Sequence, residues 1–225
     1  MHRRLFPAAA AIGAALMLPP VADAQIIEIG QTSEPATPAC PTDCLAVTRT
    51  TGYQSKIGGP KGGFMMVRQD GRLVAWSISL GNPSKKQVDF FNKYVKGVAM
   101  AQITVLQPGK RWNQRVVAQG EPQRLAPYFG TTPQFALTRS IPVKKGQLIA
   151  LTVPTWAPAL SSSVADNVEW RGSRTKGTCE ETLAHTEQTR LNTTAQYYCV
   201  YKARLTYSAT LIPTPKTNVT PPKTK

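Results

Sequence analysis

The feature that most constrains this chain is a two-residue alternation near its C-terminus, in residues 196–211. Successive side chains of a β-strand point to opposite faces, so a period of two held over such a length predicts a long, half-buried strand. Cys199 belongs to the inward set, and we expect it to join this strand to a neighbour through a disulfide. The inward set is Tyr197, Cys199, Tyr201, Ala203, Leu205, Tyr207, Ala209 and Leu211.

Further segments carry strand signals. Asp70-Gly71 separates two apolar runs and predicts a hairpin, because both turn positions must tolerate positive φ. Residues 101–105 alternate before a Pro108-Gly109 turn. A second hairpin is expected around residues 144–147, and its arm, residues 148–153, is apolar at nearly every position, as in a central strand covered on both faces.

One segment has helical rather than strand spacing. Val88, Phe91 and Val95 recur at helical intervals, Ser84 and Gln87 form a capping-box pattern, and Gly97 is a typical helix stop. The sequence therefore predicts one short helix at about residues 85–96 within an all-β chain.

The two ends of the chain have different compositions from its middle. Residues 1–24 carry a basic head, an apolar run and a small-residue cleavage pattern, which predict a secretory signal peptide. Residues 25–41 are expected to be a flexible lead-in, and residues 213–225, rich in Pro, Thr and Lys, a disordered tail. Residues 42–212 remain as a single antiparallel β-sandwich domain of a secreted or surface-exposed protein. No second apolar run is long enough for a transmembrane helix.

The cysteines support this location. All four lie after the signal peptide, and an even count in an oxidising compartment indicates two disulfides, with three possible pairings. Their spacing matches no common zinc motif, and C-x-x-C is absent, so we expect neither a metal site nor a redox role. The cysteines are Cys40, Cys44, Cys179 and Cys199.

Two resemblances bear on the fold. The Tyr-Tyr-Cys run resembles the sixth strand of an immunoglobulin domain, but the spacing of Cys44, Trp76 and Cys199 does not match that family. The segment Val-Lys-Lys-Gly-Gln-Leu-Ile-Ala-Leu is similar to a V-x-x-G-D-x-I-x-L hairpin of jelly-roll sandwiches, including secreted carbohydrate-binding modules. Together with DGRLVAWSISLG, it makes residues 64–160 resemble uncharacterised secreted bacterial jelly-roll-type sandwich proteins. Gln147 replaces the acidic residue of that pattern, which counts against calcium.

Catalytic signals are weak. After residue 24 the single histidine is His185, in a polar stretch, and no G-x-S-x-G elbow proposes a serine nucleophile. Asp166 with Glu169, or Glu180 with Glu181, are the carboxylate pairs that a secreted glycan hydrolase or lyase would need, although neutralising nearby lysines is the simpler role. We expect no enzyme and no cofactor.

Binding a ligand requires fewer specialised residues than catalysis does. The chain has 27 Lys and Arg against 12 Asp and Glu, a formal net charge of +15, which favours anionic partners. Outside a cell such partners are acidic glycans or wall polymers, and we expect no specific nucleic acid. The sequence thus predicts a noncatalytic protein that binds anionic polymers; a module that stacks neutral sugars on exposed tryptophans is the alternative. For each tryptophan, burial in the core competes with a role in binding. Candidate contacts are Trp112, Trp156, Trp170, Lys110, Arg111, Lys144, Lys145, Arg171 and Arg174, and acceptor sequons begin at Asn192 and Asn218.

Overall fold

The computed structural model describes residues 25–33, 36–58, 63–162, 164–181, 183 and 187–215. The signal peptide expected in residues 1–24, His185, Asn218 and the tail from residue 216 lie outside the described residues.

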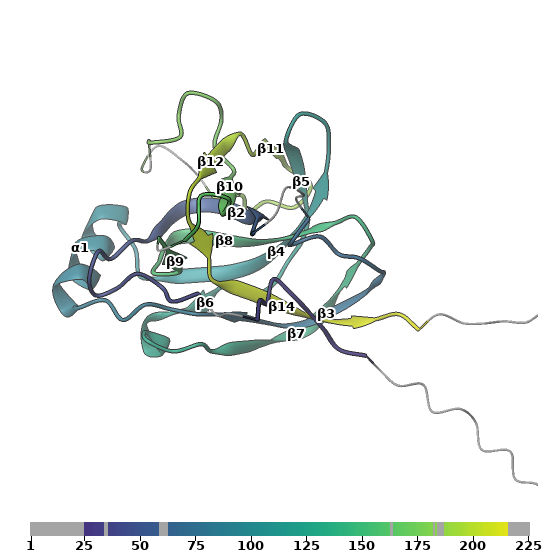
Figure 1. Cartoon of the computed structure of the whole chain (residues 1–225), viewed down its shortest axis with the longest axis horizontal. Coiled ribbons are helices and arrows are strands. Elements are labelled where there is room, and N and C mark those ends of the chain that lie inside the picture. The colour runs from purple at the N-terminus through teal and green to yellow at the C-terminus, as the bar shows by residue number, and fades with distance from the viewer. Residues whose placement is uncertain are drawn as a thin grey trace, which may run out of the picture.

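The described chain forms two antiparallel sheets that pack face to face (Figure 1). The smaller sheet, called sheet A, has the order β1 (Ile27–Ile29), β14 (Tyr207–Pro213), β3 (Gly71–Ile78), β7 (Gln134–Val143). The larger, sheet B, has the order β11 (Thr194–Gln196), β5 (Asn113–Gln119), β4 (Met100–Pro108), β8 (Leu148–Ala157), β2 (Val47–Lys56), β10 (Glu169–Gly172), β12 (Cys199–Tyr201), with β6 (Gln123–Arg124) on β4. A third, two-stranded sheet pairs β9 (Leu160–Ser161) with β13 (Arg204–Leu205). The prediction of an all-β sandwich is confirmed.

The buried apolar side chains form two clusters, one on each face of sheet B. The main one lies between the sheets and includes Trp76 of β3 and Ile103 of β4. From β8, Ile149, Leu151 and Val153 point into this cluster. The opposite face of β8 gives Leu148 and Ala150 to a second cluster, with Tyr53, Leu106, Val116 and Tyr197. β8 is therefore a central strand buried on both faces, as its apolar run predicted.

The long strand expected over residues 196–211 is divided. The chain leaves sheet B after β12, pairs briefly as β13, and enters sheet A as β14. The alternation survives in burial, since Tyr197 and Cys199 are buried while Tyr198 and Val200 are exposed. A change of sheet in the middle of one alternating run is common in sandwiches, where a strand turns a corner between layers.

Of the three predicted turns, one joins paired strands. β4 and β5 form the hairpin expected after Pro108. The other two hairpins were wrong. Residues 144–147 do form a turn, but β7 and β8 lie in different sheets, so this turn connects the layers. The run before Asp70 does not pair with β3; Met65 and Val67 bond instead to the start of β8 (Ile149 N to Met65 O, 2.9 Å; Val67 N to Gln147 O, 2.8 Å).

The predicted helix is present as α1 (Lys85–Val95), with the capping box of Ser84 and Gln87 formed. The residue in the left-handed conformation at its end is Lys96, not Gly97. A short 3-10 turn, η1 (Ala126–Tyr128), follows β6. The lead-in is not uniformly flexible, because residues 27–29 pair with β14 and Ile29 is buried.

Two disulfides resolve the pairing that the sequence left open: Cys40–Cys44 and Cys179–Cys199. Among the described residues, no helix combines the length and apolar character needed to cross a membrane. The two disulfides are compatible with an extracellular protein.

Candidate functional site

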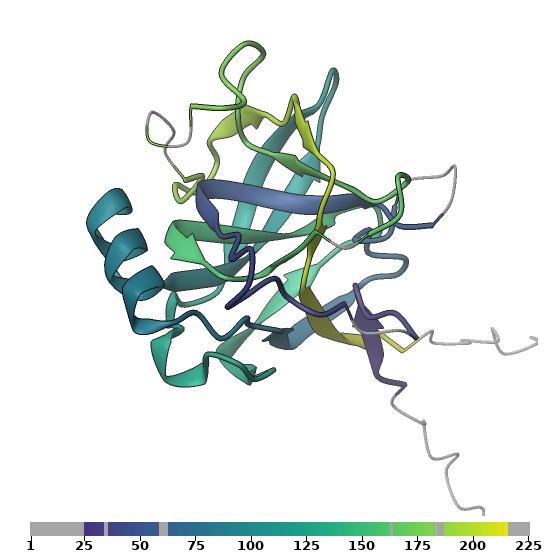
Figure 2. The ribbon, with the colours of Figure 1, turned by 60° about the vertical axis from the view of Figure 1, so that its left-hand side comes forward.

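Sheet B curls until its two outer strands meet. β11 and β12 stand at opposite ends of the strand order, yet only Tyr197 and Tyr198 separate them in sequence. Gln196 and Cys199, the facing ends of these strands, are three residue steps apart and therefore lie at most about 11 Å apart, so the edges must be close together. The backbone N–H of Tyr197 donates to the carbonyl of Trp112, in the β4–β5 turn, at 2.8 Å. We call the meeting point of these edges, formed by Trp112, Arg171, Tyr197 and Tyr198, the seam; Figure 2 shows the curl from a second side.

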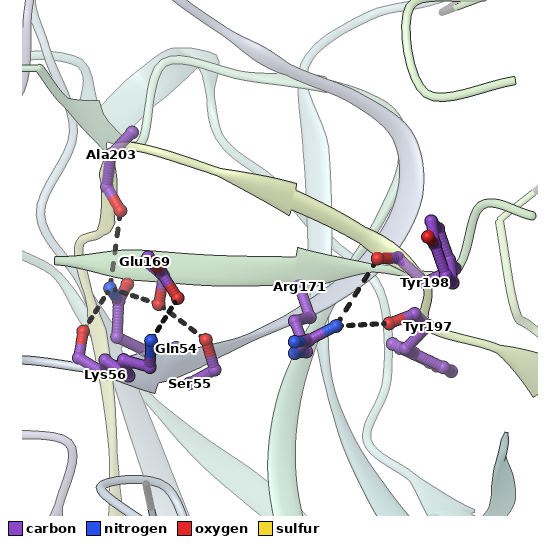
Figure 3. A network of polar contacts seen from close by, with 8 residues as sticks. All are labelled: Gln54, Ser55, Lys56, Glu169, Arg171, Tyr197, Tyr198 and Ala203. Carbon is purple, nitrogen blue, oxygen red and sulfur yellow. Dashed lines mark hydrogen bonds and ion pairs between the residues drawn. The ribbon is translucent and has the colours of Figure 1, made fainter. Parts of the chain in front are cut away.

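Arg171 of β10 lies at the centre of the seam. Its guanidinium carbon stands 3.7 Å from the centroid of the Trp112 ring, a cation–π geometry. One guanidinium nitrogen also donates to the carbonyls of Tyr197 and Tyr198, each at 3.3 Å (Figure 3). Trp112 remains 50% exposed, so an aromatic ring and a cation are presented to solvent together.

The position of Arg171 is fixed by the other end of its strand. The buried side chain of Gln54 donates to the carbonyls of Glu169 (2.9 Å) and Ala203 (3.3 Å) and accepts from the N–H of Leu205 (2.8 Å). Lys56 forms an ion pair with Glu169 at 3.0 Å. These contacts hold β10 between β2 and the chain that follows β12; Figure 3 draws those of Gln54 with Glu169 and Ala203 and the ion pair of Lys56 with Glu169. The seam is thus a built feature of sheet B rather than a chance contact of surface side chains.

The turn that carries Trp112 has an unusual backbone. Asn113 N donates to Lys110 O at 3.1 Å, and the two central residues have positive φ, 53° for Arg111 and 65° for Trp112. Asn-Gly is the usual choice for such a pair, because a left-handed conformation costs a residue with a side chain about 1–2 kcal/mol. Strained residues of this kind concentrate at binding and catalytic sites. The chain places a cation and an aromatic ring where Asn-Gly would be more stable.

We therefore expect Arg111→Asn to raise the free energy of unfolding by about 1 kcal/mol, because asparagine tolerates the left-handed region better than arginine. For a chain of this size the melting temperature should rise by about 2–4 °C. Thermal unfolding followed by circular dichroism measures this. Lys110→Asn, one residue earlier and outside the strained pair, is the control and should change little. A lower melting temperature for Arg111→Asn would contradict the strain.

The surface around the seam is positively charged. Lys110 and Arg111 flank Trp112, and the ammonium of Lys176 lies 5.9 Å from the ring of the exposed Tyr198. Within the part of the chain that the structure describes, three ion pairs form: Lys56–Glu169, Lys85–Asp89 and Lys202–Asp166. None of them involves a cation of the seam region, namely Lys110, Arg111, Arg171 or Lys176. No carboxylate of the described residues is therefore in direct contact with these cations to cancel the positive field at the seam.

Beneath the seam the tyrosines stay neutral. Tyr53 and Tyr197 lie with ring centroids 5.7 Å apart inside the curl. Burial raises the pKa of both hydroxyls, and for Tyr53 the nearby charge of Arg171 opposes part of this rise. Because both phenols hold their protons at neutral pH, they do not reduce the positive charge of Arg171.

The structure separates the predicted contact residues into three groups. The first group lies on or beside the seam and consists of the one exposed tryptophan, Trp112, and three cations. Lys110 and Arg111 directly precede Trp112, and Arg171 lies over its ring. Lys144 and Lys145 are exposed at a different turn, where the N–H of Lys145 donates to Asp70 at 2.8 Å.

Three of the candidate contacts have buried side chains. Trp156 is fully buried and stacks on Phe91. Trp170 stacks on Tyr201 at 4.4 Å and lies against Gly52, where a Cβ would stand 2.7 Å from its ring. None of these ring faces is open to a ligand.

Arg174 is the third. Its buried guanidinium donates to the carbonyls of Thr48 (3.0 Å) and Cys179 (3.1 Å) and to the hydroxyl of Tyr201 (2.8 Å). It supports the loop that carries the second disulfide. Sequence reasoning in turn missed Tyr198 and Lys176, because residues far apart in the chain complete the seam only when sheet B curls.

Of the two proposed carboxylate pairs, the first has lysine partners. Asp166 lies 3.3 Å from Lys202, and Glu169 pairs with Lys56. Glu180 and Glu181 are exposed in the loop after β10. A groove of about 440 Å³ on the outer side of sheet A is lined mainly by hydroxyl and amide side chains, and its one described carboxylate, Glu28, accepts a hydrogen bond from Thr210 at 2.6 Å. The described lining of this groove thus holds no pair of carboxylates for glycoside hydrolysis.

Comparisons with protein families, with characterised proteins and with solved structures found no match to this chain. Its function is therefore argued from the geometry of the seam.

Proposed function

We propose that this chain is a secreted, noncatalytic binding protein that holds anionic polymers, such as acidic glycans or wall polymers, on the seam. The observation that carries the proposal is the stacking of Arg171 on the exposed ring of Trp112, beside a strained turn that adds Lys110 and Arg111. The cations attract carboxylate or sulfate groups, and the aromatic rings give an apolar surface to the sugar between them. The net charge of +15 brings such polymers to the molecule in the first place.

The geometry favours an acidic over a neutral sugar. Arg171 already covers one face of the Trp112 ring, so a neutral sugar has at most the other face for stacking. An acidic sugar gains a charge-assisted hydrogen bond from the same arginine, and such bonds are about twice as strong as neutral ones.

Measuring the affinity of the protein for polygalacturonate and for neutral dextran tests this proposal. We expect Trp112→Ala and Arg171→Gln each to weaken polygalacturonate binding about tenfold, which corresponds to about 1.4 kcal/mol. The matched control Lys144→Gln/Lys145→Gln removes two charges from another turn and should cost less than about threefold, because exposed charges there are screened by salt. Binding should also weaken as NaCl rises from 0.05 to 0.5 M, while dextran should bind much more weakly throughout.

Two outcomes would overturn the proposal. Equal losses in the seam variants and the lysine control would mean that adhesion follows net charge alone. Salt-independent binding, or dextran binding as strong as that of polygalacturonate, would support the neutral-sugar alternative instead.

A further inference from the structure

α1 presents two exposed aromatic side chains on the face opposite the one that packs on the sandwich. Its inner face packs on the sandwich through Phe91, whose ring lies 4.8 Å from that of Trp156, and through the buried Val95. On its outer face Phe90 and Tyr94 stack on each other, with ring centroids 5.6 Å apart and an angle of 11° between the planes. Phe90 is 57% exposed and Tyr94 is 42% exposed. Exposed apolar patches rimmed by polar residues are a feature of protein and membrane interaction sites.

This surface also carries unbalanced positive charge. Lys86 and Lys93 stand at helical intervals from Phe90 and Tyr94, and Lys96 follows at the end of the helix; all three are exposed. The one acidic residue of α1, Asp89, is neutralised by Lys85 at 2.7 Å. We call Lys86, Phe90, Lys93 and Tyr94 the outer face of α1.

The position of the helix makes this face accessible to a flat surface. In Figures 1 and 2 α1 lies at one end of the molecule, away from the β4–β5 hairpin that forms part of the seam. The seam and the outer face of α1 are therefore separate surfaces, and a partner of one leaves the other free.

The chemistry of the face selects among partners. A second copy of this chain is disfavoured, because both copies carry a large positive charge. A hydrated acidic polymer matches the lysines but offers no continuous apolar layer in which the stacked pair of Phe90 and Tyr94 can be buried together. A lipid surface offers both, since aromatic side chains settle at the headgroup boundary and lysines attract anionic headgroups. We propose that the outer face of α1 docks on a membrane surface that contains anionic phospholipid.

Co-sedimentation with vesicles tests this proposal. Vesicles of phosphatidylcholine with about a third phosphatidylglycerol should bind the intact protein, and vesicles of pure phosphatidylcholine should not. Phe90→Ala/Tyr94→Ala keeps every charge and should lower the partition coefficient about tenfold, since each ring loses the benefit of burial. Lys86→Gln/Lys93→Gln should lower it about fivefold for each lysine removed.

Controls on other surfaces separate this site from general adhesion. Leu191→Ala, at a side chain that is 54% exposed, and Lys144→Gln/Lys145→Gln should bind vesicles within about threefold of the original chain. The seam variant Arg171→Gln should also keep its vesicle binding, so failure here and failure of the polymer proposal are distinguishable. Circular dichroism confirms that each variant is folded.

Three results would overturn the proposal. Unchanged vesicle binding by Phe90→Ala/Tyr94→Ala would show that net charge alone causes the adhesion. Equal losses with Lys144→Gln/Lys145→Gln would show that no particular face is used. Equal binding to vesicles with and without phosphatidylglycerol would show that the interaction does not depend on anionic lipid.

Discussion

Replacing Trp156 with alanine is expected to lower the free energy of unfolding by about 4 kcal/mol, because truncating a fully buried tryptophan loses its apolar burial and leaves a cavity. Trp156 is completely buried, its ring stacks on Phe91, and its Nε1–H donates to Asn92 Oδ1 at 2.9 Å. The substitution therefore removes the contact that joins α1 to β8. Sequence reasoning had considered this residue as a ligand contact, so its large effect should appear in stability and not in binding.

Urea unfolding followed by tryptophan fluorescence and circular dichroism measures the loss. Trp156→Phe keeps an aromatic ring but removes the N–H donor, and should cost clearly less than Trp156→Ala. Trp112→Ala is the complementary control: with its ring half exposed, it should cost less than about 1 kcal/mol. A loss below about 1 kcal/mol for Trp156→Ala would contradict the assigned role. So would a folded Trp156→Ala variant that no longer binds polygalacturonate.

Local patterns in the sequence predicted the class of the fold. The period of two identified the inward set that contains Cys199, and the continuous apolar run of residues 148–153 identified a central strand. The capping box at Ser84 located the start of α1, and the predicted end lies one residue beyond the observed one. These signals succeed because they depend on how neighbouring side chains alternate or repeat, which any local segment displays.

The sheet to which each strand belongs could not be predicted in the same way. Asp70-Gly71 has the composition of a hairpin turn, yet β3 finds its partners in β14 and β7. A turn fixes the direction of the chain over a few residues, whereas the choice of partner depends on packing across the whole domain. The same limit explains why residues 196–211 looked like one strand although they serve two sheets.

The candidate site was predicted only in part for a related reason. Composition pointed to Trp112 and to several cations, but it did not distinguish Arg171, which lies on an exposed ring, from Arg174, which is buried three residues later. Both arginines lie in one short basic stretch. Their roles diverge because the curl of sheet B turns one toward the seam and encloses the other against Cys179 and Tyr201.

Removing the Cys179–Cys199 disulfide is expected to cost about 3 kcal/mol, whereas removing Cys40–Cys44 should cost about 2 kcal/mol, because a cross-link restricts the unfolded chain more when it closes a longer loop. The sequence separations are 20 and 4 residues. The longer bridge also holds the loop whose Cys179 carbonyl accepts hydrogen bonds from Arg174 and, at 2.7 Å, from the Tyr201 hydroxyl. Urea unfolding of Cys179→Ala/Cys199→Ala and Cys40→Ala/Cys44→Ala under identical conditions gives the comparison.

The same pair of variants links the fold to the seam. Tyr197 and Tyr198 directly precede Cys199, and their carbonyls accept the hydrogen bonds of Arg171. We therefore expect Cys179→Ala/Cys199→Ala to bind polygalacturonate more weakly even at temperatures where it is fully folded, because the edge strand that positions Arg171 is no longer tied down. Cys40→Ala/Cys44→Ala, whose bridge lies outside sheet B, should bind as the original chain does. Equal stability losses in the two variants, or unchanged affinity in the first, would mean that this disulfide does not support the seam.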